Sequence, residues 1–296
     1  MNRPILILLV GIPGSGKTTY ANKYIEINPN TVHLSSDRIR AELWGSEATQ
    51  GDNNEVFSLM QSRAIESLNN GQSVIYDATN ITRRDRACII SQCPKFAKIE
   101  AHIVWAPIEV CIERDAARER TVGKEVIDRM LKRFQSPFYD EGIAEIKVIQ
   151  SDIFGHKYYR DKVFLDMDIP HDNPHHELNI KEHCLEAYKH AIDLQIGDQA
   201  NYDCDVTMAA LYHDIGKPYV KAFIDSKGNS CKVAHYYQHQ CLSAYMSYGI
   251  LDITPEVAWL ISVHMDPFMN TKYYNKLPPY LKKKVDLLHK CDLAAH

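Results

Sequence analysis

The stretch that decides the fold is Leu8-Leu9-Val10-Gly11-Ile12-Pro13-Gly14-Ser15-Gly16-Lys17-Thr18-Thr19. It fits the Walker A pattern, in which a glycine and four further residues precede Gly-Lys-Thr. The apolar run at residues 5–10 predicts a buried strand, and a helix is expected over residues 16–27. Strand, glycine-rich loop and helix in this order are typical of a phosphate-binding loop.

Each residue type in this loop has a physical role in binding a nucleotide. Glycines allow successive backbone N–H groups to turn toward a phosphate, and the helix N-terminus favours negative charge. Lys17 is expected to reach the β- and γ-phosphates, and the hydroxyl of Thr18 is suited to Mg²⁺. We therefore predict a site for ATP with Mg²⁺ made by Gly11, Gly14, Ser15, Gly16, Lys17, Thr18 and Thr19.

Composition limits the class of protein. A chain of 296 residues suits two domains, and 45% hydrophobic with 24% charged residues is typical of a soluble globular protein. The formal charge of −4 argues against wholesale coating of nucleic acid but allows a local basic groove. The eight cysteines form no Cys-x-x-Cys pair, which favours a reducing cytoplasm, the host cytoplasm for a phage-encoded protein. No segment is long enough to span a membrane, so no membrane partner is expected.

Strands and helices are predicted to alternate through the first half of the chain. Further strands are expected at about residues 31–34, 73–77, 101–105 and 146–149. Helices are expected at about residues 36–43, 54–68, 83–96, 109–118 and 124–134. This alternation predicts an α/β domain over residues 1–152, with a parallel sheet covered by helices on both faces.

The pattern changes after residue 150. Residues 153–177 are rich in Tyr, Asp, His and Pro, and residues 169–174 cannot continue a helix, so we expect a linker there. Residues 178–296 show helical apolar periodicity nearly throughout, which predicts a second, all-α domain.

Two carboxylates and three arginines extend the first site beyond nucleotide binding. Asp77 ends a predicted strand at the carboxyl edge of the sheet, where ligands of open α/β folds bind. Asp37 follows the second strand at the same edge and is the candidate general base for an attacking hydroxyl. Arg114 and Arg118 share one helix face, so with Arg120 they can form a lid over the transferred phosphate.

Residues 4–150 resemble the phage-type polynucleotide 5′-kinases. Beside the Walker A loop and the arginines, the resemblance rests on Asp37-Arg38-Ile39-Arg40, Asp77-Ala78-Thr79-Asn80 with Arg83-Arg84, and Ser136-Pro137 with Glu141-Gly142. It implies that Asp37 activates a 5′-hydroxyl, that Arg40 contacts an acceptor phosphate and that Asp77 shapes the acceptor and metal site. Arg118 matches the lid arginine best, and Arg120 remains an alternative for that role.

The second half carries His183, His213-Asp214, His239, His264 and Asp292 in this order. An adjacent His-Asp pair can place two ligands at one point, with the carboxylate bridging two metal ions. The set resembles the HD superfamily of metal-dependent phosphohydrolases over residues 178–296. The resemblance implies one ion held by His183, His213, Asp214 and Asp292, and a second held by Asp214, His239 and His264.

Several assignments in this half remain open. His235 is an alternative to His239, and Lys217 is expected either to neutralise a substrate phosphate or to be a solvated lysine. No role is assigned to His171, His175 and His176. The metal is a divalent transition metal or Mg²⁺, with Mn, Fe, Co, Ni and Zn all open.

Together the two halves resemble bifunctional polynucleotide kinase-phosphatases. The expected function is healing of RNA or DNA ends: phosphorylation of a 5′-hydroxyl with ATP, and removal of a 3′-phosphate or 2′,3′-cyclic phosphate. A nucleic-acid ligase acting downstream is an expected partner. Alternatives are a small-molecule kinase fused to a nucleotide or cyclic-nucleotide hydrolase, and a non-catalytic nucleotide sensor. RNA or DNA preference is open, and so is the oligomeric state, a homo-oligomer included.

Overall fold

A computed structural model describes residues 3–47, 49, 51–150, 156–174, 177–196 and 202–295. The chain divides into two compact units, which are treated separately below. Unit 1 contains residues 1–130 and 137–153, and unit 2 contains residues 131–136 and 154–296. His175 and His176, which have no predicted role, lie outside the described residues.

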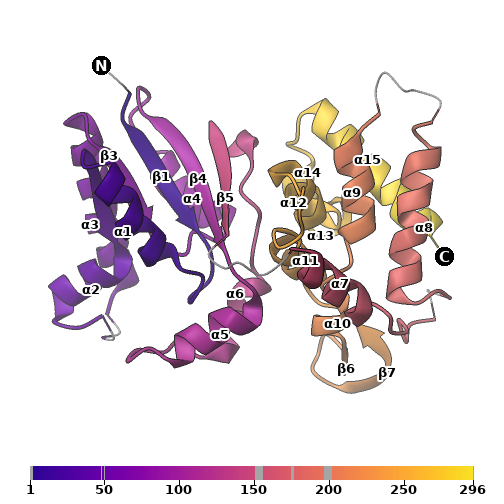
Figure 1. Cartoon of the computed structure of the whole chain (residues 1–296). Coiled ribbons are helices and arrows are strands. Elements are labelled where there is room, and N and C mark those ends of the chain that lie inside the picture. The colour runs from indigo at the N-terminus through magenta and orange to yellow at the C-terminus, as the bar shows by residue number, and fades with distance from the viewer. Residues whose placement is uncertain are drawn as a thin grey trace. The chain divides into compact units, whose positions relative to one another are not determined.

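Unit 1 is built on a parallel sheet with the strand order β2-β3-β1-β4-β5, of which Figure 1 labels all but β2. β1 lies at the centre and leads directly into the Walker A loop, so the loop is placed at the carboxyl edge of the sheet. The strands are β1 (Ile5–Val10), β2 (Thr31–Ser35), β3 (Ser73–Asp77), β4 (Lys98–Trp105) and β5 (Glu145–Gln150).

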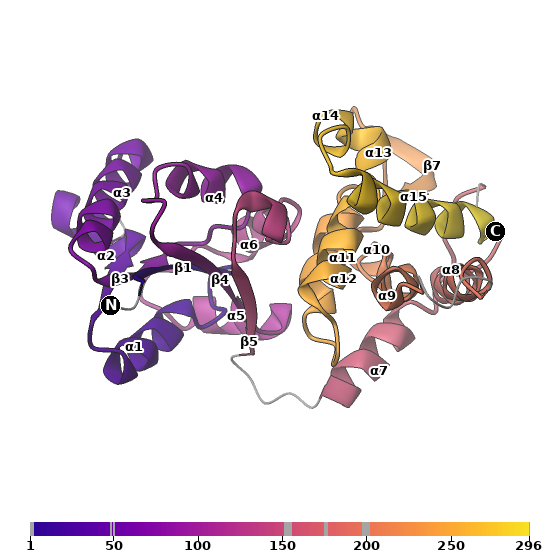
Figure 2. The same ribbon diagram turned by 90° about the horizontal axis from the view of Figure 1, so that it is seen from above.

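Helices cover both faces of this sheet, as the α/β prediction requires (Figure 2). On one face α1 packs against a core that includes Ile7, Leu9 and Ile75. On the other face α3 and α4 pack over a core that includes Leu8 and Tyr76. The helices of this part of the chain are α1 (Lys17–Ile27), α2 (Ser36–Trp44), α3 (Asn53–Asn69), α4 (Arg83–Ile90), α5 (Ile108–Ala116), α6 (Lys124–Leu131) and the 3₁₀ turn η1 (Tyr139–Glu141).

The expected α/β fold of the first half is thus confirmed, with differences at some element ends. The helix expected over residues 83–96 ends at Ile90, because Ser91 closes the helix and Pro94 follows shortly after it. The helix expected to reach residue 134 ends at Leu131, and β4 begins three residues before the predicted start.

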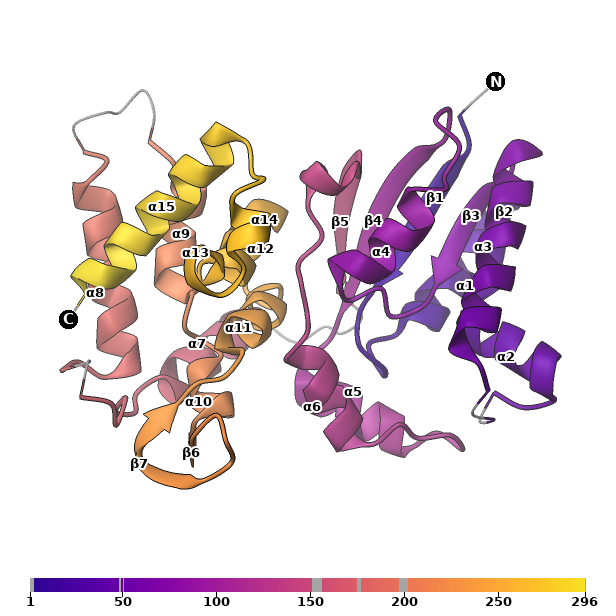
Figure 3. The same cartoon turned by 180° about the vertical axis from the view of Figure 1, so that it is seen from behind.

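Unit 2 is mostly helical. Its central helix α9 packs against α8, α12 and α15, and α11 packs against α12 (Figure 3). The helices are α7 (His156–Asp166), α8 (Ile180–Asp193), α9 (Cys204–Tyr212), α10 (Lys217–Val220), α11 (His239–Ser247), α12 (Pro255–Val263), α13 (Asp266–Met269), α14 (Thr271–Tyr274) and α15 (Pro279–Ala294).

The expectation that this half contains only helices is wrong in one place. β6 (Ala222–Ile224) and β7 (Ser230–His235) form an antiparallel hairpin. Its turn depends on Asp225, whose carboxylate accepts hydrogen bonds from the backbone N–H groups of Lys227 and Asn229, and on Gly228 at φ 86°. Only a glycine adopts that backbone conformation without steric cost.

The segment expected to be a linker is partly structured. α7 lies inside it and belongs to unit 2, with Tyr159, Val163 and Met167 buried. These residues recur every four positions and therefore form one apolar helix face. The many Tyr, Asp and Lys residues around them concealed this stripe in the composition.

A short piece of the first half also belongs to unit 2. Within the segment 131–136, the fully buried Phe134 ring packs edge-on against Tyr245 of α11, with ring centroids 5.4 Å apart. The hydroxyl oxygens of Ser136 and Tyr248 lie 2.5 Å apart. Residues 131–136 therefore contribute to the core of unit 2 although they precede β5 in the chain.

Among the described residues, no helix combines the length and the apolar character that a membrane crossing needs.

Candidate phosphate-binding loop and candidate metal centre

The Walker A loop depends on glycines that no other residue can replace. Gly14 has φ 79°, and a Cβ atom there would lie 2.2 Å from the carbonyl oxygen of Cys111 at the start of α5. Gly16 has φ 98° and immediately precedes α1. Because both positions need positive φ, the loop turns tightly enough to direct its N–H groups into one concavity.

Two side chains of the loop fit a bound triphosphate. Ser15 is fully buried, and its hydroxyl has no hydrogen-bond partner among the described residues. The Lys17 ammonium donates to the carbonyl oxygen of Ile12, 2.8 Å away, and so lies folded over the loop. Burial lowers the pKa of the Lys17 amine, and the nearby Asp77 carboxylate opposes this shift. A polyanion bound in the loop would supply the counter-charge that burial demands.

Asp77 links the loop to the sheet. It is the last residue of β3, and its side chain is 5% exposed. The Thr18 hydroxyl donates to Asp77 Oδ2 at 2.9 Å, and His33 Nε2 lies 3.0 Å from the same oxygen. The structure therefore brings the predicted Mg²⁺ ligand Thr18 together with Asp77. It also adds His33, which sequence reasoning missed.

Asp37 lies in the first turn of α2, at the carboxyl edge of the sheet. Ser35, rather than Asp37, caps this helix: its side chain accepts from the backbone N–H of Arg38 at 3.5 Å. The Asp37 side chain is 50% exposed, and its Oδ1 accepts from Arg40 Nη1 at 2.8 Å and from Arg120 Nη1 at 3.0 Å. A half-exposed carboxylate between two arginines is accessible to an acceptor that carries phosphate.

The other two predicted arginines lie on the nucleotide side. Arg114 Nη1 donates to the carbonyl oxygen of Gly14 at 3.5 Å, which places it against the loop. Arg118 is exposed just beyond the end of α5, and its charge contributes to lowering the pKa of Lys17. Asp115 holds the turn after α5, because its carboxylate accepts from the backbone N–H groups of Val122 and Gly123.

The remaining residues quoted for the kinase resemblance have structural contacts. The Asn80 side-chain amide donates to the carbonyl oxygen of Leu9 at 2.8 Å, and the backbone N–H of Gly11 donates to Thr79 at 3.0 Å. Arg86 is fully buried and makes a two-pronged ion pair with Glu141, at 2.7 and 2.6 Å. The bonds of Asn80 and Thr79 join this segment to the end of β1 and to the first residue of the Walker A motif.

In unit 2, five helices bring six predicted ligands to one point. His183 lies on α8, the His213-Asp214 pair follows α9, and His239 begins α11. His264 follows α12, and Asp292 lies on α15. Their ligand atoms form two groups, each within 4.8 Å: His183, His213 and Asp292, and Asp214, His239 and His264. All are buried except Asp292, whose side chain is 22% exposed.

The four histidines share one hydrogen-bond pattern. Each Nδ1 faces a backbone carbonyl oxygen at 2.6–2.9 Å, and these oxygens belong to Ala295, Ala210, Tyr236 and Ile261. An N–H at Nδ1 satisfies that contact and leaves Nε2 with a free lone pair. Histidines that bind metals are typically oriented by such a bond at the other ring nitrogen.

The Nε2 atoms face one another and nearby carboxylates, and His183 Nε2 lies 3.0 Å from Asp292 Oδ1. His183 Nε2 lies 3.2 Å from His213 Nε2, and His239 Nε2 lies 3.2 Å from His264 Nε2. Two lone pairs at this distance repel unless a cation lies between them. Asp214 Oδ2 is 3.3 Å from His213 Nε2, and its Oδ1 is 3.1 Å from His239 Nε2. The donor set therefore fits divalent metal ions, with Asp214 between two positions.

The residues of this cluster differ in protonation. Burial opposes a charge on His213, but the neighbouring carboxylates of Asp214 and Asp292 raise its pKa well above the usual value, so this ring must lose a proton before it binds a metal. Burial, together with the nearby imidazoles of His239 and His213, lowers the pKa of His264 to about 3. Burial would raise the pKa of Asp292, but the contacting imidazoles of His183 and His213 hold it well below its usual range. A neutral imidazole and an ionised carboxylate are the forms that coordinate metal.

Lys217 has a different environment from the one proposed for a phosphate ligand. Its side chain is 9% exposed, and its ammonium lies 2.5 Å from Asp214 Oδ2 and 3.4 Å from His171 Nε2. It also lies over the ring of Tyr236, 5.4 Å from the centroid. His171, to which the sequence assigned no role, is 1% exposed and packs edge-on against His183. Lys217 and His171 thus contact the candidate ligands Asp214 and His183 directly.

His235, the alternative to His239, lies apart from both ligand groups. It ends β7, and its ring stacks on Tyr237 with an interplanar angle of 6°. The contact of His239 with Asp214 and His264 makes His239 the residue of the pair that joins the cluster.

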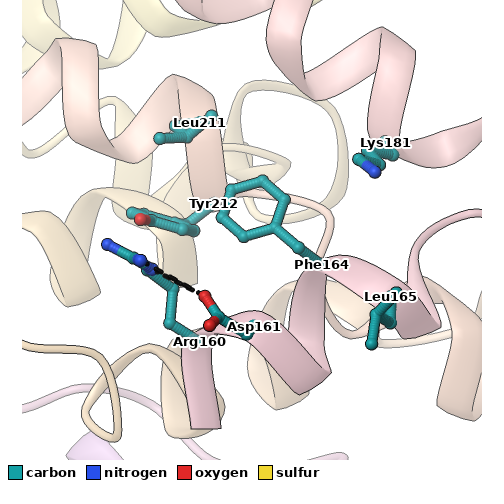
Figure 4. Close-up of a pocket in the computed structure, with 7 residues that line it drawn as sticks. All are labelled: Arg160, Asp161, Phe164, Leu165, Lys181, Leu211 and Tyr212. Carbon is teal, nitrogen blue, oxygen red and sulfur yellow. Dashed lines mark hydrogen bonds and ion pairs between the residues drawn. The ribbon is translucent and has the colours of Figure 1, made fainter. Parts of the chain in front are cut away.

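A separate hollow of about 500 Å³ opens between α7, α8 and α9. Figure 4 shows the Phe164 and Tyr212 rings side by side in an edge-on contact, with Arg160 beside Tyr212 and paired to Asp161. None of the predicted site residues lines this hollow.

Comparison with known proteins finds a separate family match in each half of the chain. Residues 6–137 match the model of the AAA domain family, and residues 180–294 match the model of the HD domain family.

Three known proteins are similar to part of this chain. "L-seryl-tRNA(Sec) kinase" of Methanococcus maripaludis is 30% identical over 145 residues, which are 45% of this chain and 53% of that protein. "Transcription factor bHLH140" of Arabidopsis thaliana is 27% identical over 157 residues, which are 51% of this chain and 16% of that protein. A chain in "Structure of the Pnkp1/Rnl/Hen1 RNA repair complex" is 26% identical, with a TM-score of 0.41, over 45% of this chain and 44% of that one.

The chain spans about half or less of the length of these proteins, and the matches cover about half of this chain. The two family matches, the loop in unit 1 and the histidine cluster in unit 2 agree on the organisation of the molecule. The chain thus consists of a parallel α/β domain with a P-loop, followed by a mostly helical domain that matches the HD model.

Proposed function

We propose that this protein heals nucleic-acid ends: unit 1 phosphorylates a 5′-hydroxyl with ATP, and unit 2 removes a 3′-phosphate or 2′,3′-cyclic phosphate. The observation that carries the proposal is the presence in one chain of a Walker A loop, with Asp37 and its arginines at the same sheet edge, and of a histidine-aspartate cluster that could hold metal ions. A strand end with 5′-hydroxyl and 3′-phosphate needs both reactions before a ligase can join it. A nucleic-acid ligase is therefore the expected downstream partner.

In the kinase reaction, this proposal assigns each residue a distinct task. The loop amides and Lys17 bind the phosphates of ATP, and Thr18 holds Mg²⁺. Asp37 accepts the proton of the attacking hydroxyl, which its half-exposed position allows. Arg40, beside Asp37, binds a phosphate of the acceptor strand. Arg118 neutralises charge on the transferred phosphoryl group, with Arg114 on the loop beside it.

We assign the two lid candidates to different sides of the reaction. Arg118 acts electrostatically on Lys17, whereas Arg120 contacts Asp37. We therefore assign Arg118 to the transferred phosphate and Arg120 to the acceptor side.

In the hydrolase reaction, the six ligands of unit 2 would hold two divalent ions. Ions bound there would polarise a terminal phosphate ester and supply an activated water. The Nδ1 bonds to backbone carbonyls orient the histidines before the metal arrives. Lys217 and His171 hold Asp214 and His183 in position.

The test is end-group analysis of an oligonucleotide that carries a 5′-hydroxyl and a 3′-phosphate, offered as RNA and as DNA. With ATP, Mg²⁺ and Mn²⁺, the protein should add label from γ-labelled ATP to the 5′ end and release inorganic phosphate from the 3′ end. Nucleosides and nucleotides offered in parallel test the small-molecule alternative. Transfer of label to nucleosides with none to the oligonucleotide would contradict the end-healing proposal.

A further inference from the structure

One buried histidine of unit 1 belongs to neither the Walker A loop nor the arginine cluster. His33 is the third residue of β2, and its side chain is 2% exposed. In the parallel pairing of β2 with β3, His33 lies opposite Ile75 and Ser35 lies opposite Asp77. Because alternate residues of a strand share a face, His33 and Asp77 both point toward the side that α1 covers.

His33 shares a single carboxylate oxygen with the loop. Its Nε2 lies 3.0 Å from Asp77 Oδ2, and the Thr18 hydroxyl donates to the same atom at 2.9 Å. The three side chains come from β2, β3 and the first turn of α1, so they connect three elements beneath the nucleotide site.

The contact defines the proton position on the imidazole. A lone pair on Nε2 would repel the carboxylate, so Nε2 carries the hydrogen and donates it to Asp77. The other nitrogen, Nδ1, is buried and has no partner among the described residues. A neutral ring with its one N–H directed at Asp77 satisfies this geometry, whereas a charged ring would leave a buried N–H without an acceptor.

We propose that His33 is a positioning residue for the magnesium ion of the kinase site. Its N–H holds Asp77 in the orientation that accepts the hydrogen of Thr18, which would leave the lone pairs of the Thr18 oxygen available to bind the ion. This inference rests on the proposed kinase function, because it assigns Thr18 to Mg²⁺. Residues that orient metal ligands in this way typically change metal affinity or activity about 10- to 100-fold when removed.

The test measures binding of a fluorescent ATP analogue by the full chain, in EDTA and across a magnesium titration. His33→Leu removes the N–H and should raise the half-saturating Mg²⁺ concentration about 10- to 100-fold, with nucleotide binding in EDTA unchanged. His33→Gln places an amide N–H near the position of Nε2 and should restore most of the loss. His33→Asn is polar but too short to reach Asp77, so it should behave like His33→Leu.

His102→Leu is the matched control. His102 is fully buried on the same face of the sheet and contacts Tyr20 of α1 at 2.8 Å, but no contact joins it to Asp77. A general disturbance of α1 should affect this variant as much as His33→Leu and weaken binding equally with and without magnesium.

The outcomes distinguish failure of the role proposed for His33 from failure of the proposed kinase function. An unchanged magnesium requirement in both His33→Leu and His33→Asn, or equal losses in His33→Leu and His102→Leu, would overturn the role of His33. Failure of the unaltered protein to bind the nucleotide at any magnesium concentration would instead overturn the kinase function itself. If His33→Leu does not fold, the comparison of His33→Gln with His33→Asn decides the question by the reach of the donor alone.

Discussion

The phosphate-binding loop and the metal cluster hold their ligands in opposite ways. The loop comes from a single run of residues, and its phosphate donors are mostly backbone N–H groups directed by glycines at positive φ. The metal cluster draws side chains from five helices that lie between His183 and Asp292 in sequence. A local loop needs only its own conformation, whereas the cluster needs the packing of a whole unit. The loop thus depends on glycine geometry and the cluster on the core.

Removing one group from each site tests whether the loop and the metal cluster act independently. Lys17→Ala should reduce phosphoryl transfer by at least about 100-fold, because it removes a positive charge from the phosphates. Asp214→Ala should abolish phosphate release, because Asp214 is the carboxylate that contacts both His213 of one group and His239 of the other. Each variant should leave the other activity within about twofold. The end-group assay measures both activities, and joint loss in either variant would indicate one composite site.

The dependence of the cluster on packing is tested by a residue remote from the metal. Phe134→Ala should destabilise unit 2 by about 3–5 kcal/mol, because it removes a fully buried ring from contact with Tyr245 and Tyr248. Chemical denaturation, followed by a probe of α11, measures the change.

Phe268→Ala is the control for this substitution, since Phe268 is in the same unit but 62% exposed. It should cost less than about 1 kcal/mol. Equal effects of the two substitutions would show that residues 131–136 are not part of the core of unit 2. A fragment that begins at residue 153 should also be less stable than unit 2 in the full chain.

Removal of metal should distinguish the two units. Because the Nε2 atoms of the cluster face one another, bound ions should stabilise unit 2, by about 2.7 kcal/mol at a free metal concentration 100 times the dissociation constant. A chelator should therefore lower the melting temperature of unit 2 and leave that of unit 1 unchanged. Calorimetry with added Mn²⁺ or Zn²⁺ measures this shift, and an unchanged melting temperature would contradict metal binding by the six ligands.

The smallest expected effect is an acid-sensitive ion cluster in unit 1. Burial opposes ionisation of Glu100, but hydrogen bonds from Lys98, Lys147 and His102 lower its pKa from 4.5 to about 2. A carboxylate with a lowered pKa stabilises the folded state above pH about 4.5, and this contribution is lost as the pH falls toward 2. We expect about 1–2 kcal/mol, since both lysines are partly exposed and their attraction is screened.

Glu100→Gln should remove this acid dependence from the denaturation midpoint of unit 1. Glu145→Gln is the matched control: Glu145 contacts the same two lysines but is 40% exposed. A larger change from Glu145 than from Glu100 would contradict the explanation by burial.

Much of unit 1 could be predicted because its signals are local. The apolar run, the glycine spacing and Gly-Lys-Thr lie within about a dozen residues, and the strands alternate with helices at regular distances. Asp37 and Asp77 could be assigned to one edge because parallel strands all end there. His33 escaped notice because its partner Asp77 is 44 residues away, and a histidine within a short strand has no local signature.

The predictions that failed in unit 2 depended on weaker signals. The β6–β7 hairpin is short, and only the turn at Asp225 and Gly228 marks it. The stripe Tyr159, Val163 and Met167 on α7 is hidden among polar and aromatic residues. The sequence predicts that Phe134 ends a helix of the first domain, although its ring packs in the core of unit 2.

The sequence by itself determined the phosphate-binding loop, the order of the two domains and the candidate ligands, because each depends on residue types at short spacing. Only the tertiary structure decided that His239 rather than His235 joins the metal cluster. It also showed that Lys217 contacts Asp214 and that His171 contacts His183. The contact of His33 with Asp77 likewise came from the structure alone. These contacts join residues on different elements. They exist only when the cores of the two units have placed those elements side by side.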